Sequence, residues 1–489
     1  MKKYNLAVIV IGMLFISGKA QATGIQTSTL HPENTPGEVR RLKHLDNAVD
    51  IQRDYGPVRY DSAGLDSFIR VHMDTAHIPG LATWCLKDGQ VIWQQSYGYA
   101  NLEDSIEVTD TTLFSLASIS KTITGAAIMQ LWERDSFELD DDINDYLPFI
   151  VRNPDYPDSA ITFRMLMTHT SSIHDNSSII NSLLVPWNDS PIPLGTFLEG
   201  YLVPGGSYYS LYNYRNFAPG AEYDYSNVAI GLLGYLVETI EDSFPVYCQD
   251  SIFGPLNMEK TSWFLADLDT NNLARAYQWM GSYYARRPWW GAPNYPCCYL
   301  RSSVTELAQF LTTIAQHGMI DTVRILDSTT VELILSHQFE VGTDWWIGLV
   351  WHHCGWVFPG RWVWLHNGAG DGVDTFMGIC LDENSAVIAL ANCENYGCSW
   401  TVAEALLDYA AQYAVEENTI ESRRNKCIGP TVLSGPLRLP EGVNCRVFDI
   451  TGRVVAPQHI KPGVYFIEID EQIVQKVIKV ITVIGLLSS

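Results

Sequence analysis

Residues 114–125 constrain the fold of this chain more than any other stretch. Apolar residues recur there and just beyond with the period of a buried helical face, at Ile119, Ile123, Ala127 and Leu131. Ser118 and Lys121 lie three positions apart at the start of this pattern. Residues at that spacing share one side of a helix, with Cβ atoms about 5–6 Å apart. A fold that buries this helix therefore places a hydroxyl beside an amine.

The pair formed by Ser118 and Lys121 has a chemical interpretation. A serine hydroxyl becomes a nucleophile when a base takes its proton, and burial can lower the pKa of a lysine far enough for it to be that base. A helix N-terminus also offers free N–H groups to a developing oxyanion. The alternative is a helix cap followed by a solvated lysine, because both residue types are common.

The composition is that of a globular protein. Of the 489 residues, 47% are hydrophobic and 18% are charged, so the chain can bury a sizeable core. The formal net charge is −24. Such acidity argues against binding nucleic acid or an anionic membrane surface through charge.

The N-terminus has the pattern of an export signal. Lys2 and Lys3 precede an apolar run, residues 6–16, and Ala20-Gln-Ala22 is a small-x-small cleavage site. We therefore expect a signal peptide over residues 1–22, followed by a polar extension over 23–59. The run is short for a membrane span, and no other spanning run follows, so the mature chain is expected to be secreted or held at the cell surface.

The main part of the chain predicts an α+β fold in which helices cover a sheet. A helix is expected from about Leu65, and Asp88-Gly89 separates two β-rich runs as in a hairpin. Ser302-Ser-Val-Thr-Glu306 has the pattern of a capped helix start. We assign residues 60–420 to this domain, with a helical insert and lid at about 140–300. Within it, residues 175–222 lack clean periodicity and are expected to be a lid or wall, not a core element.

Residues 427–489 differ in texture from the main domain. Short strand-like runs such as 445–450 and 464–469 alternate with turns, which predicts a small, separate, all-β module.

Ten cysteines offer several pairings. After export, Cys393 could pair with Cys398 and Cys427 with Cys445, but connectivity cannot be deduced from sequence. A zinc site would combine residues 352–354 with Cys297-Cys298, yet this spacing matches no closed ligand pattern. We therefore expect no metal.

Two further segments could complete a serine–lysine site. Tyr225 and Asn227 supply a second proton carrier and a group that can hold a substrate carbonyl. His366-Asn-Gly368 follows a strand-like run, where glycine permits close approach. Each segment alone is unremarkable in a fold, so their weight lies in occurring together and in this order.

These segments resemble a known family. Ser118-x-x-Lys121, Tyr225-x-Asn227 and His366-x-Gly368 are similar to the three motifs of serine beta-lactamase-related hydrolases, which include class C beta-lactamases, D-Ala-D-Ala carboxypeptidases, D-aminopeptidases and carboxylesterases. Neighbouring segments agree, among them residues 166–172 and 300–310. The resemblance covers about residues 60–415 and implies an antiparallel sheet flanked by helices, with a mostly helical domain inserted.

The resemblance also implies a role for each motif residue. Ser118 would be the acylated nucleophile and Lys121 its base. Tyr225 would protonate the leaving group and activate the deacylating water. No metal or cofactor is implied.

The substrate-binding roles follow in the same way. Asn227 would bind the substrate amide, and His366 and Gly368 would line the substrate edge. The backbone N–H groups of Ser118 and Ala369 would form the oxyanion hole.

The chain departs from the family pattern at two places. His366 stands where class C beta-lactamases have lysine, and histidine occurs there in the peptidase and esterase relatives. Cys297-Cys298 replaces a turn of small residues before Leu300.

The C-terminal module has its own resemblance. Residues 447–455 and 460–467 are similar to the type A sorting domain of type IX secretion. This implies export machinery as a partner of the module.

Two functions of different classes remain open at this point. The first is an exported serine hydrolase that forms an acyl-enzyme with a small-molecule or peptide substrate, either an amide or an ester. The second is a non-hydrolytic or slowly acylating protein that binds or senses a ligand on the same fold. The presence of Ser118, Lys121 and Tyr225 together favours the enzyme.

Overall fold

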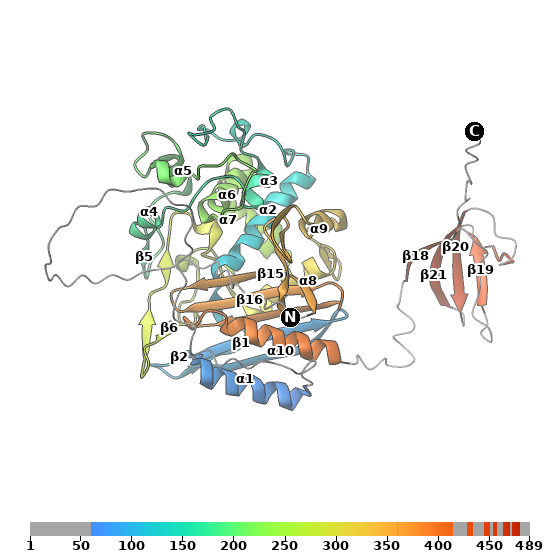
Figure 1. Ribbon diagram of the computed structural model, residues 1–489. Helices are drawn as coiled ribbons and strands as arrows, with labels where there is room; N and C mark the ends of the chain where they lie inside the picture. Colours follow the sequence, from blue (N-terminus) through green and yellow to red (C-terminus); the bar gives the residue numbers. More distant parts are fainter. Residues whose placement is uncertain are drawn as a thin grey trace, which may run out of the picture. The chain divides into compact units, whose positions relative to one another are not determined.

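A computed structural model describes residues 60–358 and 360–413, together with segments 428–433, 445–449, 453–456, 463–469 and 472–479. The chain divides into two compact units, Met1–Tyr413 and Ala414–Ser489 (Figure 1). The expected signal peptide and N-terminal extension lie outside the described residues and stay predictions.

A nine-stranded antiparallel sheet forms the centre of the larger unit (Figure 1). The N-terminal hairpin lies next to the last strand of the sheet, so segments far apart in the sequence are neighbours. In spatial order the strands are β12 (Phe339–Gly342), β13 (Trp345–Ile347), β14 (His352–Phe358), β15 (Arg361–Gly370), β16 (Val373–Cys380), β17 (Ser385–Ala391), β1 (Gly80–Lys87), β2 (Gln90–Asn101) and β3 (Ile106–Glu107).

The hairpin between β1 and β2 confirms the turn predicted from Asp88-Gly89. Both residues have positive φ, 48° for Asp88 and 77° for Gly89, which a two-residue hairpin turn of type I′ requires. The turn thereby fixes the register in which Lys87 faces Gln90.

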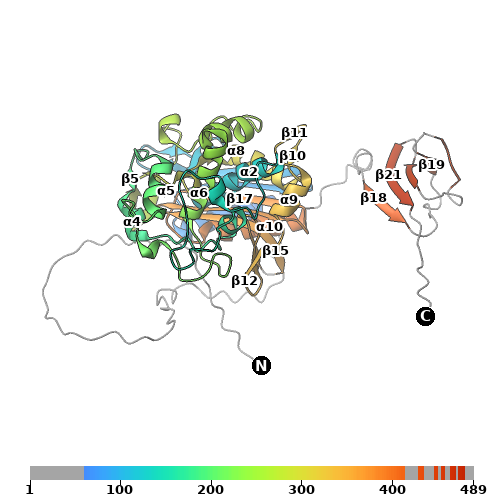
Figure 2. The same cartoon turned by 90° about the horizontal axis from the view of Figure 1, so that it is seen from above.

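Helices cover both faces of the sheet (Figures 1 and 2). α1 (Ser62–Ala76) and α10 (Cys398–Gln412) pack on one face, and α8 (Val304–Ala315) packs on the other. Side chains alternate along β17 accordingly. Val387 and Ala389 pack in the hydrophobic cluster with α1 and α10, and Ile388 and Leu390 pack in the cluster with α8. Burial on both faces explains why β17 is apolar from Ala386 to Ala391.

α2 (Ser120–Glu133) and α6 (Asn227–Glu241) belong to the same hydrophobic cluster as α8 and extend it away from the sheet. The sequence predicted one buried face for α2. In the structure every residue from Ser120 to Leu131 is buried, because other elements surround the helix. A lysine in its first turn is therefore removed from bulk water.

α8 begins as its sequence predicted. The Ser303 hydroxyl accepts a hydrogen bond from the Glu306 N–H at 3.2 Å. The Glu306 carboxylate does not return to the cap; it accepts from the backbone N–H of Lys260 and the hydroxyl of Thr261. It thereby ties the start of α8 to the insert.

The insert contributes to the core as well as to the wall of the site. α5 (Leu194–Leu202) buries Phe197, Leu198 and Tyr201 in the main cluster, so the expectation that residues 175–222 hold no core element is wrong. The remaining α-helices in the described part of the larger unit are α3 (Phe163–Met167), α4 (Ser177–Ser182), α7 (Phe244–Cys248) and α9 (Ser328–Ile334).

Pairs of short strands complete the larger unit. They are β4 (Leu113–Ser115) with β9 (Arg301–Ser303), β5 (Val185–Pro186) with β8 (Trp290–Gly291), β6 (Ala276–Trp279) with β7 (Tyr284–Arg287), and β10 (Met319–Ile320) with β11 (Val323–Arg324).

The second unit contains four described strands in one sheet. Their order is β18 (Ile428–Leu433), β21 (Gln472–Lys479), β20 (Gly463–Ile469) and β19 (Cys445–Asp449), and only the β18–β21 pair is parallel. The all-β character of residues 427–489 as a whole, and their resemblance to a sorting domain, stay predictions. Among the described helices of the whole chain, none has the length and apolar character to cross a membrane.

Candidate active site

Ser118 lies on a tight turn between β4 and α2. The turn is a 3-10 helix, Ala117–Ile119, so the serine precedes the α-helix and only the lysine lies within it. Ala117 has a φ of 46°, a left-handed conformation that costs energy for any residue with a side chain. A backbone hydrogen bond from Leu116 to Leu300 holds the approach to this turn. The packing around the serine turn therefore offsets the energetic cost of this conformation.

Lys121 joins the serine to the rest of the site. Its Nζ donates to Ser118 Oγ at 3.0 Å, to Asn227 Oδ1 at 2.7 Å and to the Cys297 carbonyl oxygen at 2.8 Å. The side chain has no exposed surface. The structure thus brings Ser118 and Lys121 together as their spacing predicts.

The protonation of Lys121 differs from the sequence-based expectation. Burial opposes its charge, but the interactions with the acidic groups of Cys298 and then of Tyr225 outweigh burial and raise the pKa of the amine above its ordinary value. The expectation of a pKa lowered by burial is therefore wrong for this arrangement. Lys121 is an ammonium that donates to Ser118.

The ring of Tyr225 faces the amine of Lys121. The Lys121 Nζ is 4.9 Å from the centre of the tyrosine ring, and the phenol interacts with both Ser118 and Lys121. Burial raises the pKa of Tyr225 to about 12, although the Lys121 charge acts in the opposite direction. Tyr225 therefore keeps its proton at neutral pH and can donate it.

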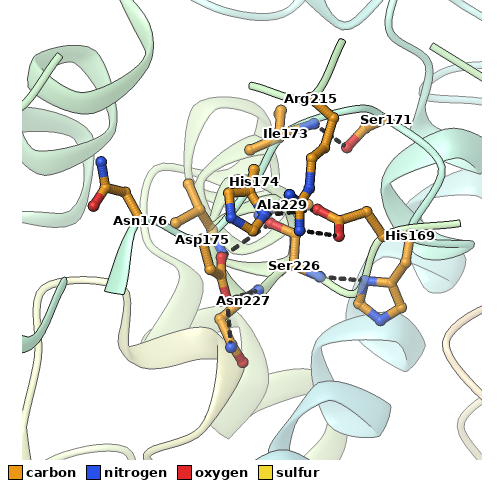
Figure 3. Close-up of polar contacts among 12 residues, drawn as sticks. His169, Ser171, Ile173, His174, Asp175, Asn176, Arg215, Ser226, Asn227 and Ala229 are labelled. Atoms are coloured by element: carbon orange, nitrogen blue, oxygen red, sulfur yellow. Dashed lines mark hydrogen bonds and ion pairs between the residues drawn. The ribbon is translucent and has the colours of Figure 1, made fainter. Parts of the chain in front are cut away.

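Asn227 is held by Asp175, a residue that the sequence did not single out (Figure 3). The Asn227 side-chain N–H donates to Asp175 Oδ2 at 2.6 Å, and its backbone N–H donates to the same oxygen at 2.9 Å. Asp175 also accepts from Ser226 Oγ and from the Val228 N–H at the start of α6. The carboxylate therefore fixes the helix start and aims Asn227 Oδ1 at Lys121.

A second carboxylate, that of Asp224, lines the cleft. Asp224 Oδ2 is 2.8 Å from His174 Nδ1, and its other oxygen accepts from Arg215 at 2.9 Å. Although burial opposes ionisation, the bonds from His174 and Arg215 keep the pKa of Asp224 below its ordinary value. Arg215 is therefore already paired with a carboxylate.

His366 brings an uncharged imidazole to the site. It is 1% exposed, and its Nδ1 is 2.8 Å from the Asn367 carbonyl oxygen. Burial, and then the unfavourable interactions with His352 and Lys121, hold the pKa of His366 well below its usual range. No cation stands at this position.

Gly368 allows β15 to approach the serine turn. A Cβ added to Gly368 would lie 2.3 Å from the Leu116 carbonyl oxygen and 2.3 Å from Thr375 Oγ1. The Thr375 hydroxyl donates to the same Leu116 oxygen at 3.0 Å. Gly368 therefore lets β15 pack against the turn that carries Ser118, and its expected place on the substrate edge stays a prediction.

A cleft of about 430 Å³ opens at Ser118. Sequence-predicted residues line it, namely Ser118, Tyr225, Asn227, His366 and Ala369. Cys298 lies in the same wall and also borders a smaller, mainly apolar cavity of about 80 Å³ next to Trp289 and Trp290. The site can therefore take an acyl group beside the serine and an apolar group beyond Cys298.

Sequence reasoning missed two residues of this site. Asp175 gave no signal, because its partners in α6 are more than 50 residues away along the chain. Cys298 stood out as a departure from a family pattern and as part of a zinc pattern that did not match, and neither placed it beside Ser118. Within residues 60–358 and 360–413, no group of three or more metal-ligating side chains is arranged to hold an ion.

The chain is similar in sequence to known proteins. A family model described as Beta-lactamase matches residues 65–411. "Protein flp" of Staphylococcus aureus (strain MRSA252) is 25% identical over 249 residues, which are 50% of this chain and 47% of that protein. The chain thus matches about half the length of this curated relative.

Two solved structures share the fold. An octameric penicillin-binding protein homologue from Pyrococcus abyssi has a TM-score of 0.58 at 21% identity, over 84% of this chain and 88% of the other. EstCE1, described as a hydrolase with promiscuous acyltransferase activity, has a TM-score of 0.57 at 19% identity, over 71% of this chain and 97% of the other. At these identities the similarity concerns the fold.

Proposed function

This chain belongs to the beta-lactamase family and is a serine hydrolase, and we propose that it works through an acyl-enzyme on Ser118. One observation carries this proposal: Lys121 Nζ donates to Ser118 Oγ at 3.0 Å beside a cleft that Ser118 lines. A nucleophile, an adjacent proton carrier and a third group that orients the carrier are the elements of such a site. Asn227, bonded to Lys121 at 2.7 Å, is the orienting group.

We propose the following roles in the reaction. Ser118 Oγ attacks the substrate carbonyl. Its proton passes to Lys121 Nζ after the ammonium has given one proton to the Cys298 sulfur, 3.3 Å away. The N–H groups of Ser118 and Ala369 hold the oxyanion. Tyr225, whose pKa is raised to about 12, donates its proton to the leaving group and later takes one from the deacylating water.

The charges around the cleft favour a substrate with an uncharged acyl group. Asp175 and Asp224 both line the cleft, and His366 is neutral. The two nearby cations, Lys121 and Arg215, are already bonded within the protein. A substrate carboxylate would gain no unpaired cation there, so we propose esters and amides, including small peptides, ahead of penicillin-like acids.

We also propose that the protein acts outside the cytoplasm. The basic and apolar pattern of residues 1–22 supports export, and the resemblance of residues 447–467 to a sorting domain supports an encounter with secretion machinery. A net charge of −24 favours a soluble small-molecule or peptide substrate over an anionic polymer.

Hydrolysis of p-nitrophenyl butyrate and of a penicillin, measured side by side, tests the proposal. The ester should turn over faster, and Ser118→Ala and Lys121→Ala should each lower kcat by about 10³-fold or more. Lys260→Ala is the matched control, since that lysine is exposed and far from the serine in the sequence. Full activity of Ser118→Ala would overturn the acyl-enzyme, and faster penicillin turnover would overturn the substrate class.

A further inference from the structure

Two adjacent thiols lie at the catalytic serine. Cys297 Sγ and Cys298 Sγ are 3.1 Å apart, at the end of a 3-10 helix, Tyr295–Cys297. Cys297 is 1% exposed, whereas Cys298 is partly exposed and lines the cleft beside Ser118. A reagent that enters the cleft therefore meets Cys298 first and finds Cys297 directly behind it.

Cys298 shares its surroundings with the nucleophile. Its Sγ lies 3.3 Å from Lys121 Nζ, 3.8 Å from Ser118 Oγ and 3.0 Å from Asn227 Oδ1. The ammonium stabilises a thiolate, whereas the amide oxygen favours the thiol. Cys298 is thus the one sulfur at the serine that faces a positive charge at contact distance.

The two thiols differ in acidity. Burial opposes ionisation of Cys298, but the hydrogen bond from Cys297 and the Lys121 charge outweigh it and lower the pKa of Cys298 to about 6. Burial and the neighbouring sulfur raise the pKa of Cys297 well above its ordinary value. At neutral pH the pair therefore contains one thiolate, which attacks, and one thiol, which can resolve the product.

We propose that Cys297 and Cys298 form a redox-active dithiol, in which Cys298 is the site modified by hydroperoxides and Cys297 closes a disulfide. The Cys298 thiolate attacks the terminal oxygen of the hydroperoxide, the O–O bond breaks, and the leaving alkoxide or hydroxide takes a proton. The Cys297 sulfur then attacks the sulfenic sulfur, gives up its proton and releases water. Two thiols are oxidised by two electrons, and one hydroperoxide is reduced to an alcohol, or to water when the peroxide is hydrogen peroxide.

The geometry requires a small movement and makes the product reversible. The sulfur atoms must close from 3.1 Å to about 2.05 Å. Adjacent Cα atoms lie about 3.8 Å apart, below the usual range for bridged cysteines, so the eight-membered ring is strained. Strained and accessible disulfides are the ones that thiols reduce readily.

The disulfide would change the base of the hydrolase, an effect that rests on the function proposed above. Closing it removes the negative charge that faces Lys121 and leaves uncharged acceptors around the amine. A buried lysine with uncharged partners loses its proton more easily and can take one from Ser118. The other titratable groups that face this cluster are Tyr225, Tyr299, His169, His352, His366 and Asp175.

Those neighbours leave the direction of the effect unchanged. Burial lowers the pKa of each of the three histidines, so they stay neutral at pH 7 in both redox forms. Burial raises the pKa of Tyr225 and of Tyr299, so both keep their protons, and Asp175 is already bonded to the start of α6. The disulfide form is therefore expected to stay active at lower pH than the dithiol form.

Peptide mass mapping tests the dithiol directly. Trypsin releases residues 287–301, which hold both cysteines and no other thiol. The experiment uses a Cys393→Ser background, because Cys393 and Cys398 are also 3.1 Å apart. After stoichiometric hydrogen peroxide, the peptide should be about 2 Da lighter and take up no N-ethylmaleimide, and dithiothreitol should restore two labelled thiols. The light peptide should be absent from Cys297→Ser and from Cys298→Ser.

Two outcomes would overturn the dithiol. One is a peptide that still takes up two maleimides after oxidation, and the other is a gain of oxygen atoms at Cys298 without ring closure. The activity arm is separate. The acid limb of kcat/KM for p-nitrophenyl butyrate should move down by about one pH unit or more when the wild type is oxidised. It should not move on oxidation in Cys298→Ser, which has no thiolate beside Lys121 in either form. An unchanged limb in the disulfide form overturns the effect on Lys121. Absence of any ester hydrolysis in both forms counts against the proposed function, while the mass arm still decides the dithiol.

Discussion

The side-chain N–H of Asn227 donates to Asp175 Oδ2 at 2.6 Å, and this bond decides where the other end of the Asn227 amide points. The amide oxygen is thereby aimed at Lys121 Nζ, 2.7 Å away. A carboxylate that touches neither the serine nor the lysine thus sets the position of the proton carrier.

Replacement of Asp175 tests this arrangement. Asp175→Ala leaves the donors at the start of α6 without their acceptor and frees the Asn227 amide to rotate. We expect kcat for ester hydrolysis to fall by about tenfold or more, which corresponds to about 1.4 kcal/mol. Stability should fall by about 2–3 kcal/mol, as expected for hydrogen bonds to a buried charge. Urea unfolding and steady-state kinetics measure the two effects, and wild-type kinetics in this variant would contradict the role of Asp175.

Gly368 is predicted to tolerate no side chain. The Cβ of Gly368→Ala would collide with the Leu116 carbonyl oxygen at 2.3 Å, so β15 and the serine turn must separate. The expected result is a loss of kcat together with a loss of stability of about 1–3 kcal/mol. Gly370 lies on the same strand, and a Cβ there would meet no atom within 4 Å, so Gly370→Ala is the matched control for stability. Equal unfolding midpoints for the two variants would contradict the account.

Phe197 is predicted to hold the insert onto the core. The side chain has no exposed surface, so Phe197→Ala should lower the free energy of unfolding by about 3–5 kcal/mol. Tyr212, 80% exposed in the same insert, provides the control, and Tyr212→Ala should change stability by less than about 0.5 kcal/mol. Chemical denaturation compares them. A small effect at Phe197 would mean that the insert is a lid without core function.

Asp374 is predicted to make stability depend on pH. Its carboxylate accepts from Ser399 Oγ and from the Gly397 N–H at 2.5 Å, yet burial dominates and raises its pKa to about 7 from an ordinary value of 3.8. Between these values the folded chain holds a proton that the unfolded chain releases, so the contribution of Asp374 to stability falls as pH rises from about 4 to 7.

Comparison with Asp374→Asn isolates that contribution. Lowering the pH from 7.5 to 5 should stabilise the wild type relative to the variant by up to about 1.4 kcal/mol for each pH unit between the two pKa values. Urea midpoints at both pH values give the difference. A difference that does not change with pH would show that Asp374 is ionised in the folded protein throughout this range.

Local signals in the sequence predicted much of the fold. The hairpin at Asp88-Gly89 and the cap at Ser303 depend on neighbouring residues, and both appear where expected. α5 was missed although its buried residues, Leu194, Phe197, Leu198, Tyr201 and Leu202, recur with helical spacing. The glycines and prolines around it hid this pattern.

The site was predictable as far as its motifs and no further. Spacing alone brings Ser118 and Lys121 together, because both lie within one turn of chain. The state of Lys121 depends on Cys298, which is 177 residues away along the chain, and the aim of Asn227 depends on Asp175. Such long-range contacts are set by packing, which a single sequence does not display.

The central claim is that Ser118 is an activated nucleophile. Intact-protein mass after incubation with a fluorophosphonate tests it most directly, with Ser118→Ala treated in parallel. We predict one adduct on the wild type, located in the tryptic peptide that spans residues 88–121, and none on the variant. An unlabelled wild-type protein that unfolds cooperatively, or a variant labelled as fully as the wild type, would contradict the account.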